Sequence, residues 1–243
     1  MIPPDHPRYR SLVVRERLAE AAREGVVALE GLTAHGRAEA FDYLIGEKST
    51  STAREAARCA AALLRQARRP VLSVNGNTAA LAAVECAALQ QATGCGIEVN
   101  LFHRTDERIR KITRLLEDAG ATVLQGVPER LIPLGHDRAL CLPHGIGRAD
   151  LILVPLEDGD RCEALRAMGR TVVTIDLNPL SRTARTATLT VVDELTRALP
   201  LITAAYADLT PEEAERLVLG LDNHYLLQAA IVEIIRGLTS ALD

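Results

Sequence analysis

The chain has 243 residues, of which 48% are hydrophobic and only 2% aromatic, with no tryptophan. This composition provides a sizeable aliphatic core, and no apolar segment reaches the length that a membrane-spanning helix requires. The formal charge of −4 and the pI of about 5.9 argue against a nucleic-acid-binding surface, and the polar N-terminus lacks a secretory leader, so we expect a cytoplasmic protein.

Helices are expected throughout the first part of the chain, residues 1–68. Apolar residues recur at helical spacing over residues 7–24, and a second helix is expected to begin after Gly36. A long Ala-rich helix follows over residues 50–68, where Ser and Thr residues provide the cap.

Strands and helices alternate over residues 69–206. We expect strands near 70–74, 97–101, 121–125, 150–155, 171–175 and 188–192. Helices are expected near 77–92, 105–118, 160–168 and 194–206. This alternation, with continuous Val, Ile and Leu strands, predicts a Rossmann-like, doubly wound, mainly parallel α/β sheet with helices on both faces.

Two further helices, over residues 211–219 and 223–241, are expected to close the fold as a C-terminal part, residues 207–243. The longest irregular segment runs from residue 128 to residue 147, and loops of this length are often functional. No linker or repeat divides the sequence, so we predict one Rossmann-like domain over residues 1–243.

The few lysines and the spacing of the cysteines limit the kinds of catalytic and binding sites that the chain can contain. The only lysines are Lys48 and Lys111, so a Walker phosphate-binding loop is excluded and few lysines are available for a Schiff base. The cysteines form no CxxC pair and no pattern with histidine that is typical of a metal site, so buried thiols are the expectation. They are Cys59, Cys86, Cys95, Cys141 and Cys162.

Polar clusters follow four of the predicted strands. The clusters are NGN from Asn75, NLFHRT from Asn100, EDGDR from Glu157 and DLNPLSRTA from Asp176. Residues just past the carboxyl ends of parallel strands converge on one rim of the sheet. The density of guanidinium, carboxylate and amide groups at this rim predicts an enzyme that holds a charged small molecule.

The cluster from Asp176 is the strongest of the four. Asp176 at a strand end can accept hydrogen bonds from ribose hydroxyls, and Asn178 can bind a base edge or a sugar. Ser181, Arg182 and Thr183 lie at the start of an expected short helix, where hydroxyl, guanidinium and free N–H groups suit a polyphosphate. The alternative is an Asx turn that only joins strand to helix.

The EDGDR cluster combines Glu157, Asp158 and Asp160 with Arg161. Carboxylates around a glycine suit Mg²⁺ held through water, the usual partner of ATP phosphates, or an ammonium group of a substrate. The alternative is a solvated helix N-terminus with acidic residues in its first turn.

The remaining two clusters offer anion ligands. Gly76 allows close backbone approach to a phosphate at a helix start, although the sequence lacks the GxGxxG fingerprint of dinucleotide sites. His103 and Arg104 are candidates for an anion ligand or a proton carrier. The alternative for His103 is a purely structural role.

Long stretches of the chain resemble one known family. They are HPRYRSL, AHGRAEAFDYLIGE, SVNGNTAAL, EVNLFHRT, ADLILVPLEDGDR and IDLNPLSRTA, in this order over roughly residues 5–205. They resemble the archaeal phosphopantothenate synthetase family, which comprises 4-phosphopantoate–β-alanine ligases. The resemblance implies a Rossmann-like homodimer of coenzyme A biosynthesis, which forms 4′-phosphopantothenate through an acyl-adenylate and releases AMP and diphosphate.

The resemblance also implies roles for individual residues. Its ATP contacts correspond to Arg15, Arg37, Asp176, Leu177, Asn178, Arg182, Thr183, Asp193 and Glu194. Glu194 is a departure, since the family commonly has Asn there. At the rim, our substrate-binding candidates are Asn75, Asn77, Asn100, Asp160 and Arg161, and our catalytic candidates are His103, Arg104 and Asp158. ATP and Mg²⁺ are the expected cofactors, with no dedicated metal site in the protein.

Two other functions stay open at this point. Another nucleotide- or phosphosugar-processing α/β enzyme, such as a kinase, is distinguished by its products, because a kinase forms ADP. A non-catalytic nucleotide-sensing module is expected to bind ATP without turnover of any acid and amine.

Overall fold

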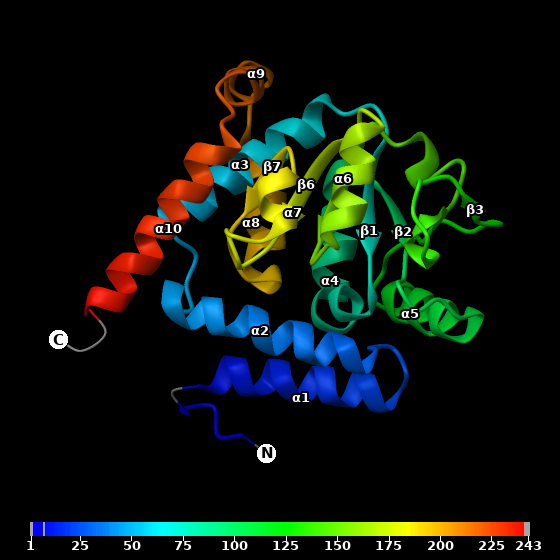
Figure 1. Cartoon of the computed structure of the whole chain (residues 1–243), viewed down its shortest axis with the longest axis horizontal. Helices are drawn as coiled ribbons and strands as arrows, with labels where there is room; N and C mark the ends of the chain where they lie inside the picture. The colour runs from blue at the N-terminus through cyan, green and yellow to red at the C-terminus, as the bar shows by residue number, and fades with distance from the viewer. Residues whose placement is uncertain (1, 7, 241–243) are drawn as a thin grey trace.

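The chain folds around a five-stranded parallel sheet with helices on both faces (Figure 1). The computed structural model describes residues 2–6 and 8–240. The strands of the sheet are β1 (Pro70–Val74), β2 (Gly96–Val99), β5 (Leu151–Pro155), β6 (Thr171–Ile175) and β7 (Leu189–Val191). The helices are α1 (Tyr9–Arg23), α2 (Leu29–Ile45), α3 (Ser51–Gln66), α4 (Gly76–Thr93), α5 (Asp106–Asp118), α6 (Gly159–Ala167), α7 (Arg182–Thr186), α8 (Leu195–Asp208), α9 (Pro211–Leu219) and α10 (Asn223–Ser240).

The strand order is β2-β1-β5-β6-β7, and every neighbouring pair is parallel. A single parallel bridge between Ile97 and Val123 adds the trace of a further strand at the β2 edge. The chain builds the sheet from β1 to β2 in one direction and from β5 to β7 in the other. The topological switch point, where α/β sheets of this kind bind ligands, therefore lies between β1 and β5. This order confirms the predicted doubly wound, Rossmann-like fold.

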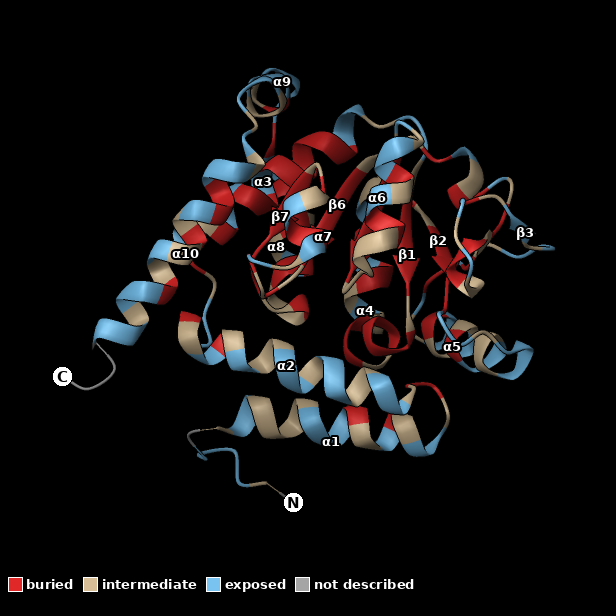
Figure 2. Ribbon diagram, viewed as in Figure 1, coloured by how far each residue is buried: buried red, intermediate tan, exposed pale blue. Residues whose placement is uncertain are grey.

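Alternating side chains of the strands contribute to two separate cores. In β5, Leu151 and Leu153 pack into a large cluster with α3, α4, α5 and α8. Ile152 and Val154 point to the other face, where they pack against α6 and the segment before β5. Figure 2 shows that the strands are almost entirely buried, which is why their sequences are continuous aliphatic runs.

The first two helices lie across the carboxyl ends of the strands (Figure 1). The side-chain amide Nδ2 of Asn77, in the first turn of α4, donates to the carbonyl of Gly31 in α2 at 2.8 Å. Farther along α2, Asp42 pairs with Arg197 of α8 at 2.5 Å. The N-terminal helices therefore cover the rim on which the predicted ligand site lies.

Two predicted elements differ from the structure. The second helix begins at Leu29 and not after Gly36. Gly36 is exposed inside the helix, and a Cβ there would meet no atom within 4 Å, so this glycine marks no helix start. The strand predicted at 121–125 is reduced to the one bridge of Val123, because apolar alternation specifies burial but not the length of a ladder at a sheet edge.

The segment predicted as irregular, residues 128–147, contains a short antiparallel pair, β3 (Glu129–Arg130) with β4 (Leu140–Cys141). Two 3₁₀ turns, η1 (Asp137–Ala139) and η2 (Ile146–Arg148), complete it. The buried carboxylate of Glu98 in β2 anchors this segment by accepting the N–H groups of Leu142 and Ile146 at 2.9 and 2.8 Å. Burial raises the pKa of Glu98, against the effect of these N–H groups and of Arg161.

The other predicted helices and strands are confirmed within about two residues of their expected bounds, including the short helix α7. The predicted ends at residues 7 and 241 lie outside the described residues. All five cysteines are buried and free, as expected.

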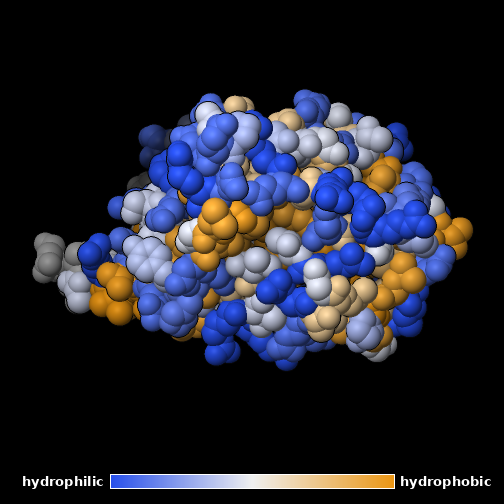
Figure 3. Space-filling view, turned by 90° about the horizontal axis from the view of Figure 1, so that it is seen from above, coloured by the Kyte–Doolittle hydropathy of each residue, from blue (hydrophilic) through white to orange (hydrophobic). Residues whose placement is uncertain are grey.

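The surface mixes hydrophilic and apolar residues (Figure 3). Over residues 2–6 and 8–240, no single helix is long and apolar enough to cross a membrane. The helices α9 and α10, which meet at 83°, reach that length and hydropathy only when they are taken together.

Candidate active site

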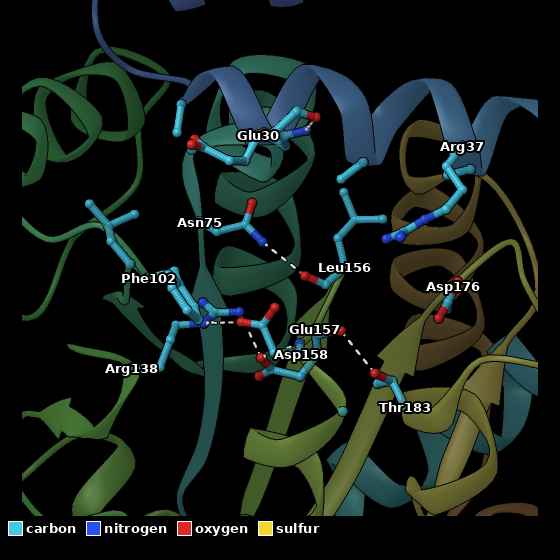
Figure 4. Close-up of a pocket in the computed structure, with 18 of the residues that line it drawn as sticks. Glu30, Arg37, Asn75, Phe102, Arg138, Leu156, Glu157, Asp158, Asp176 and Thr183 are labelled. Atoms are coloured by element: carbon cyan, nitrogen blue, oxygen red, sulfur yellow. Dashed lines mark hydrogen bonds and ion pairs between the residues drawn. The ribbon is translucent and has the colours of Figure 1, made fainter. Parts of the chain in front are cut away.

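A cavity of about 740 Å³ lies at the switch point, between the carboxyl ends of the strands and α2 (Figure 4). Predicted site residues that line it are Arg37, Asn75, Asn77, His103, Asp158, Asp176, Asn178, Arg182 and Thr183. They come from α2 and from the segments that follow β1, β2, β5 and β6. The parallel sheet thus brings distant parts of the sequence to one rim, and the binding roles of these residues stay predictions.

The turn after β1 places the N-terminus of α4 at the cavity wall. The side-chain Oδ1 of Asn75 caps the helix by accepting the N–H of Thr78 at 3.0 Å. Its Nδ2 donates to the carbonyl of Leu156 at 3.2 Å and so connects the ends of β1 and β5 across the switch point. Gly76 is required here, because a Cβ would lie 2.4 Å from the carbonyl oxygen of Val26. The positive end of the α4 dipole therefore lies at the cavity.

Leu156 follows β5 with a left-handed backbone, at a φ of 57°. This conformation costs a residue other than glycine about 1–2 kcal/mol. Two hydrogen bonds hold it, since its N–H donates to the carbonyl of Ile175 at 3.1 Å and its carbonyl accepts from Asn75. The strained turn lies at the centre of the cavity wall (Figure 4), where such strain is often functional.

Beneath the cavity, the carboxylate of Glu157 is fully buried between two buried guanidinium groups. Arg138 donates to Glu157 at 2.6 Å and to Asp158 at 2.9 Å. Arg161 pairs with the other oxygen of Glu157, and its Nη2 donates to Ser73 at 3.2 Å. Asp158 remains 43% exposed, so it offers a carboxylate oxygen to the cavity at a position that Arg138 fixes.

The turn after β6 forms the opposite wall. One oxygen of Asp176 accepts the N–H of Asn178 at 2.9 Å and the other accepts the hydroxyl of Ser181 at 2.5 Å. Burial raises the pKa of Asp176, while Ser181, Asn178 and the positive charge of Arg37 oppose the shift. Thr183 donates from its hydroxyl to the carbonyl of Glu157 at 2.8 Å. The Asx turn considered as an alternative is therefore present, and it faces the cavity.

A second cavity of about 720 Å³ adjoins the first, and Ala38 and Leu156 line both. It is lined by the predicted residues Leu177, Asp193 and Glu194. Asp193 accepts from Arg197 at 2.8 Å, and its Oδ2 is a buried oxygen without a hydrogen-bond partner among the described residues. Burial raises the pKa of Glu194, whose carboxylate accepts from Thr196.

Some predicted site residues line neither cavity: Arg15, Asn100, Arg104, Asp160 and Arg161. Arg15 forms a two-pronged ion pair with Glu39 at 2.8 to 3.0 Å. Asn100 is fully buried and supports the carbonyl of residue 140, and Asp160 pairs with His136 at 2.9 Å. The side chains of four of these residues therefore have partners within the protein: Arg15, Asn100, Asp160 and Arg161. For Arg104 the contact is made by the backbone, whose N–H donates to the carboxylate of Asp137 at 3.3 Å.

The cavity also contains charged and aromatic residues that the sequence did not predict: Glu30, Phe102, Arg108 and Arg138. The backbone N–H of Arg108 donates to the capping residue Thr105 three positions earlier. In the sequence this spacing indicates the start of a helix and does not indicate a binding residue. Arg138 comes from the segment that was recognised by its length alone. Glu30 lies in the part of α2 that was expected to precede the helix.

The carboxylates that line the cavity suit a metal ion that is held in part by the substrate. Within the part of the chain that the structure describes, no group of three or more His, Cys, Asp or Glu side chains is placed to hold an ion. Mg²⁺ commonly binds through one or two carboxylates, water and substrate phosphates. The half-exposed Asp158 fits that arrangement, with the phosphates of a bound substrate as the remaining ligands.

Comparisons with known proteins agree with the geometry. Residues 52–237 match the family described as phosphopantothenate/pantothenate synthetase. A 4-phosphopantoate–β-alanine ligase of Methanospirillum hungatei is 53% identical over 243 residues, which is 100% of both chains. Ligases of the same name from Methanosarcina mazei and Thermococcus kodakarensis are 51% and 46% identical, over 96% and 98% of this chain and 94% of each relative.

Proposed function

The chain belongs to the phosphopantothenate/pantothenate synthetase family, and we propose that it is an ATP-dependent ligase that joins 4-phosphopantoate to β-alanine in coenzyme A biosynthesis. The observation that carries the proposal is the 53% identity with a ligase of that name along the full length of both chains. The switch-point cavity supports it, because its guanidinium groups and helix N-terminus suit highly anionic substrates.

The proposed reaction has two steps. The carboxylate of 4-phosphopantoate attacks the α-phosphorus of ATP, and diphosphate leaves to give an acyl-adenylate. The amine of β-alanine then attacks the acyl carbon, an amide forms and AMP leaves. Because both substrates of the first step are polyanions, the protein has to hold them close together and stabilise the developing charge.

ATP is assigned to the Asp176 side of the cavity and to the adjoining second cavity. Arg37 reaches toward the first cavity from α2 (Figure 4), and Arg182 lies at the start of α7. Their guanidinium groups suit the triphosphate, since Arg binds phosphate through paired N–H donors. In this assignment Asp176 accepts from the ribose, and Asp193 and Glu194 lie near the adenine.

Asp158 is assigned to the ammonium group of β-alanine or to the Mg²⁺ that accompanies ATP. Arg138 holds one of its oxygens at 2.9 Å and leaves the other toward the cavity. When bound, Mg²⁺ would neutralise part of the negative charge of the phosphates. His103 and Arg104, with Asn75 and Asn77, remain the proposed neighbours of 4-phosphopantoate.

A homodimer is part of the proposal. Val232, Ile235 and Leu238 of α10 are 45%, 53% and 55% exposed, and their spacing of three residues places them on one side of the helix. Apolar atoms lie beside the C-terminal end of the chain in Figure 3. Sedimentation analysis of the purified protein tests the dimer. A cytoplasmic location stays a prediction.

The decisive experiment supplies the purified protein with ATP, Mg²⁺, 4-phosphopantoate and β-alanine, and identifies the products by mass spectrometry. The proposal expects 4′-phosphopantothenate, AMP and diphosphate in equal amounts. ADP as the nucleotide product would indicate a different phosphoryl-transfer enzyme. Binding of ATP without turnover would favour the nucleotide-sensing alternative.

A further inference from the structure

The helix α7, which begins with the proposed ATP ligand Arg182, is too short to be stable by itself. It contains five residues, whereas an isolated helix of fewer than about 12 residues is marginal in water. Its start is held by the hydrogen bonds of Ser181 and Thr183. The position of α7 therefore depends also on the groups that bind the carbonyls at its other end.

Asn223, the first residue of α10, binds those carbonyls. Its Nδ2 donates to the carbonyls of Ala184 and Ala187 at 3.0 and 3.3 Å. Its Oδ1 accepts the N–H of Thr190, in the edge strand β7, at 2.7 Å. The hydroxyl of Thr190 in turn donates to the carbonyl of Ala184 at 2.9 Å. One side chain from α10 thus fixes the end of α7 to the last strand of the sheet.

The start of α10 is capped by a different residue. The side chain of Asp222 accepts the N–H of Tyr225 at 3.0 Å, and its carbonyl accepts the N–H of Leu226 at 3.2 Å. The amide of Asn223 is therefore available to groups outside its own helix. Its three hydrogen bonds reach residues 33 to 39 positions away in the sequence.

The far part of α10 lies against α2. A Cβ on Gly237 would lie 2.3 Å from the carbonyl oxygen of Leu44, near the end of α2. This close approach of the two backbones requires glycine. Leu44 follows the other proposed ATP ligand, Arg37, by seven residues on the same helix, which corresponds to about 10 Å.

A small core fills the space between these two contacts. Leu227 and Ile234 of α10 pack there with Ala184 of α7 and Ile45 of α2. Leu177, from the turn after β6, belongs to the same core. In Figure 1, α10 runs along the β7 side of the sheet toward the end of α2. One helix therefore contacts both of the elements that carry the proposed arginine ligands of ATP.

We propose that α10 braces the ATP site by holding α7 and α2 at a fixed separation. Asn223 positions α7 and with it Arg182, and Gly237 positions α2 and with it Arg37. Asn223 and Gly237 are positioning residues, since they line neither of the two cavities. Two guanidinium groups bind one triphosphate only where their separation matches it, so a shift of either helix lowers the affinity for ATP. The inference rests on the proposed ligase function, in which ATP binds to these arginines.

The variant Asn223→Asp removes the N–H donor and keeps the shape of the side chain. Its carboxylate can still accept from Thr190, and a negative charge in the first turn of α10 is favourable for the helix dipole. The carbonyls of Ala184 and Ala187 lose this donor and face a negative group instead. We expect the Kd of ATP to rise about 5- to 50-fold.

The variant Gly237→Ala tests the other contact. The added Cβ has no room against the carbonyl of Leu44, so α2 has to move away from α10. We expect the Kd of ATP to rise about 3- to 10-fold.

Calorimetric titration of the full-length protein with ATP and Mg²⁺ measures the Kd, and steady-state kinetics measure KM for ATP and for β-alanine. The brace predicts that both constants for ATP rise and that KM for β-alanine stays within about 2-fold. Thr210→Ala is the control for a general loss of stability, because it removes the capping box of α9. Gln228→Ala is the control within α10, at an exposed position. Both controls are expected to leave the Kd of ATP unchanged.

The outcomes separate the brace from the proposed function. An unchanged Kd of ATP in either Asn223→Asp or Gly237→Ala overturns the brace, which needs both contacts, and so does equal weakening by Thr210→Ala. Should Asn223→Asp fail to fold in a thermal unfolding assay, Thr190→Val takes its place, since it removes the second donor to Ala184. Wild-type protein that binds ATP but forms no amide product refutes the ligase assignment and leaves the calorimetric test of the brace intact.

Discussion

The variant Glu157→Gln is the most direct test of the network beneath the cavity. Glu157 and its partners Arg138 and Arg161 have side chains that are 0–3% exposed. The amide keeps the shape of the carboxylate but removes the charge that compensates Arg161, whose one ion pair in the described part of the chain is with Glu157. Leaving one buried charge uncompensated costs about 3–5 kcal/mol. We therefore expect a loss of about 3–5 kcal/mol in the free energy of unfolding and about 6–20 °C in Tm.

Urea unfolding followed by circular dichroism measures this loss, with Glu117→Gln on the exposed side of α5 as the control. The control is expected to change the free energy of unfolding by less than about 0.5 kcal/mol. In the double variant Glu157→Gln with Arg161→Met, the uncompensated cation is gone, so part of the stability returns. A loss below about 1 kcal/mol for Glu157→Gln, or a double variant that is less stable than the single one, would refute the charge-compensation argument.

Three other variants probe the cavity and its support. Arg37→Gln is expected to weaken ATP binding about 10- to 100-fold in calorimetry, since it removes an unpaired cation, and an unchanged Kd would place ATP elsewhere. Gly76→Ala is expected to cost about 1–3 kcal/mol of unfolding free energy, because its Cβ would lie 2.4 Å from the Val26 carbonyl; equal Tm values for variant and wild type would contradict this. For Glu98, burial raises the pKa above 4.5, so the folded protein holds the proton more tightly and the stability contributed by this group is lost as the pH rises through the folded-state pKa. In urea titrations, the free energy of unfolding of the wild type relative to that of Glu98→Gln should accordingly fall as the pH rises above 4.5. A difference that rises with pH would contradict the raised pKa.

The sheet was predictable from the sequence because its strands are buried on both faces. A run such as that of β5, where Leu151 to Pro155 are all buried, leaves little choice of secondary structure. At the edge of the sheet, the sequence predicts the length of a strand less well. Residues 121–125 have the apolar alternation of a strand, yet only Val123 pairs, because the ladder at an edge depends on the neighbouring chain and not on local pattern.

The site was predictable where it lies at strand ends and unpredictable where it comes from other elements. Asp176 and Arg182 follow a strand, so the topology brings them to the rim. Arg138 reaches the same cavity from the segment after Gly126, whose path is set by the burial of Glu98 and not by any periodicity. Glu30 was not predicted as a site residue because it lies in a part of α2 that precedes the predicted helix: α2 begins at Leu29, whereas the helix was expected to begin after Gly36.

The three acidic residues after β5 show why side-chain type alone could not assign their roles. Alternation along a strand would send the side chains of Leu156 and Glu157 to opposite faces. The left-handed backbone of Leu156 interrupts the alternation and turns Glu157 down between Arg138 and Arg161. Asp158 then follows at the cavity wall.

Asp160, two positions farther along, lies in the first turn of α6 and pairs with His136. The strained turn at Leu156 therefore leads into two adjacent carboxylates with different surroundings, since Glu157 compensates buried charge and Asp158 lines the cavity. Replacement of Leu156 by glycine would relieve the backbone strain but weaken the constraint that keeps Glu157 buried. The strain at Leu156 is thus tied to the placement of Asp158, because both depend on the same turn at the switch point.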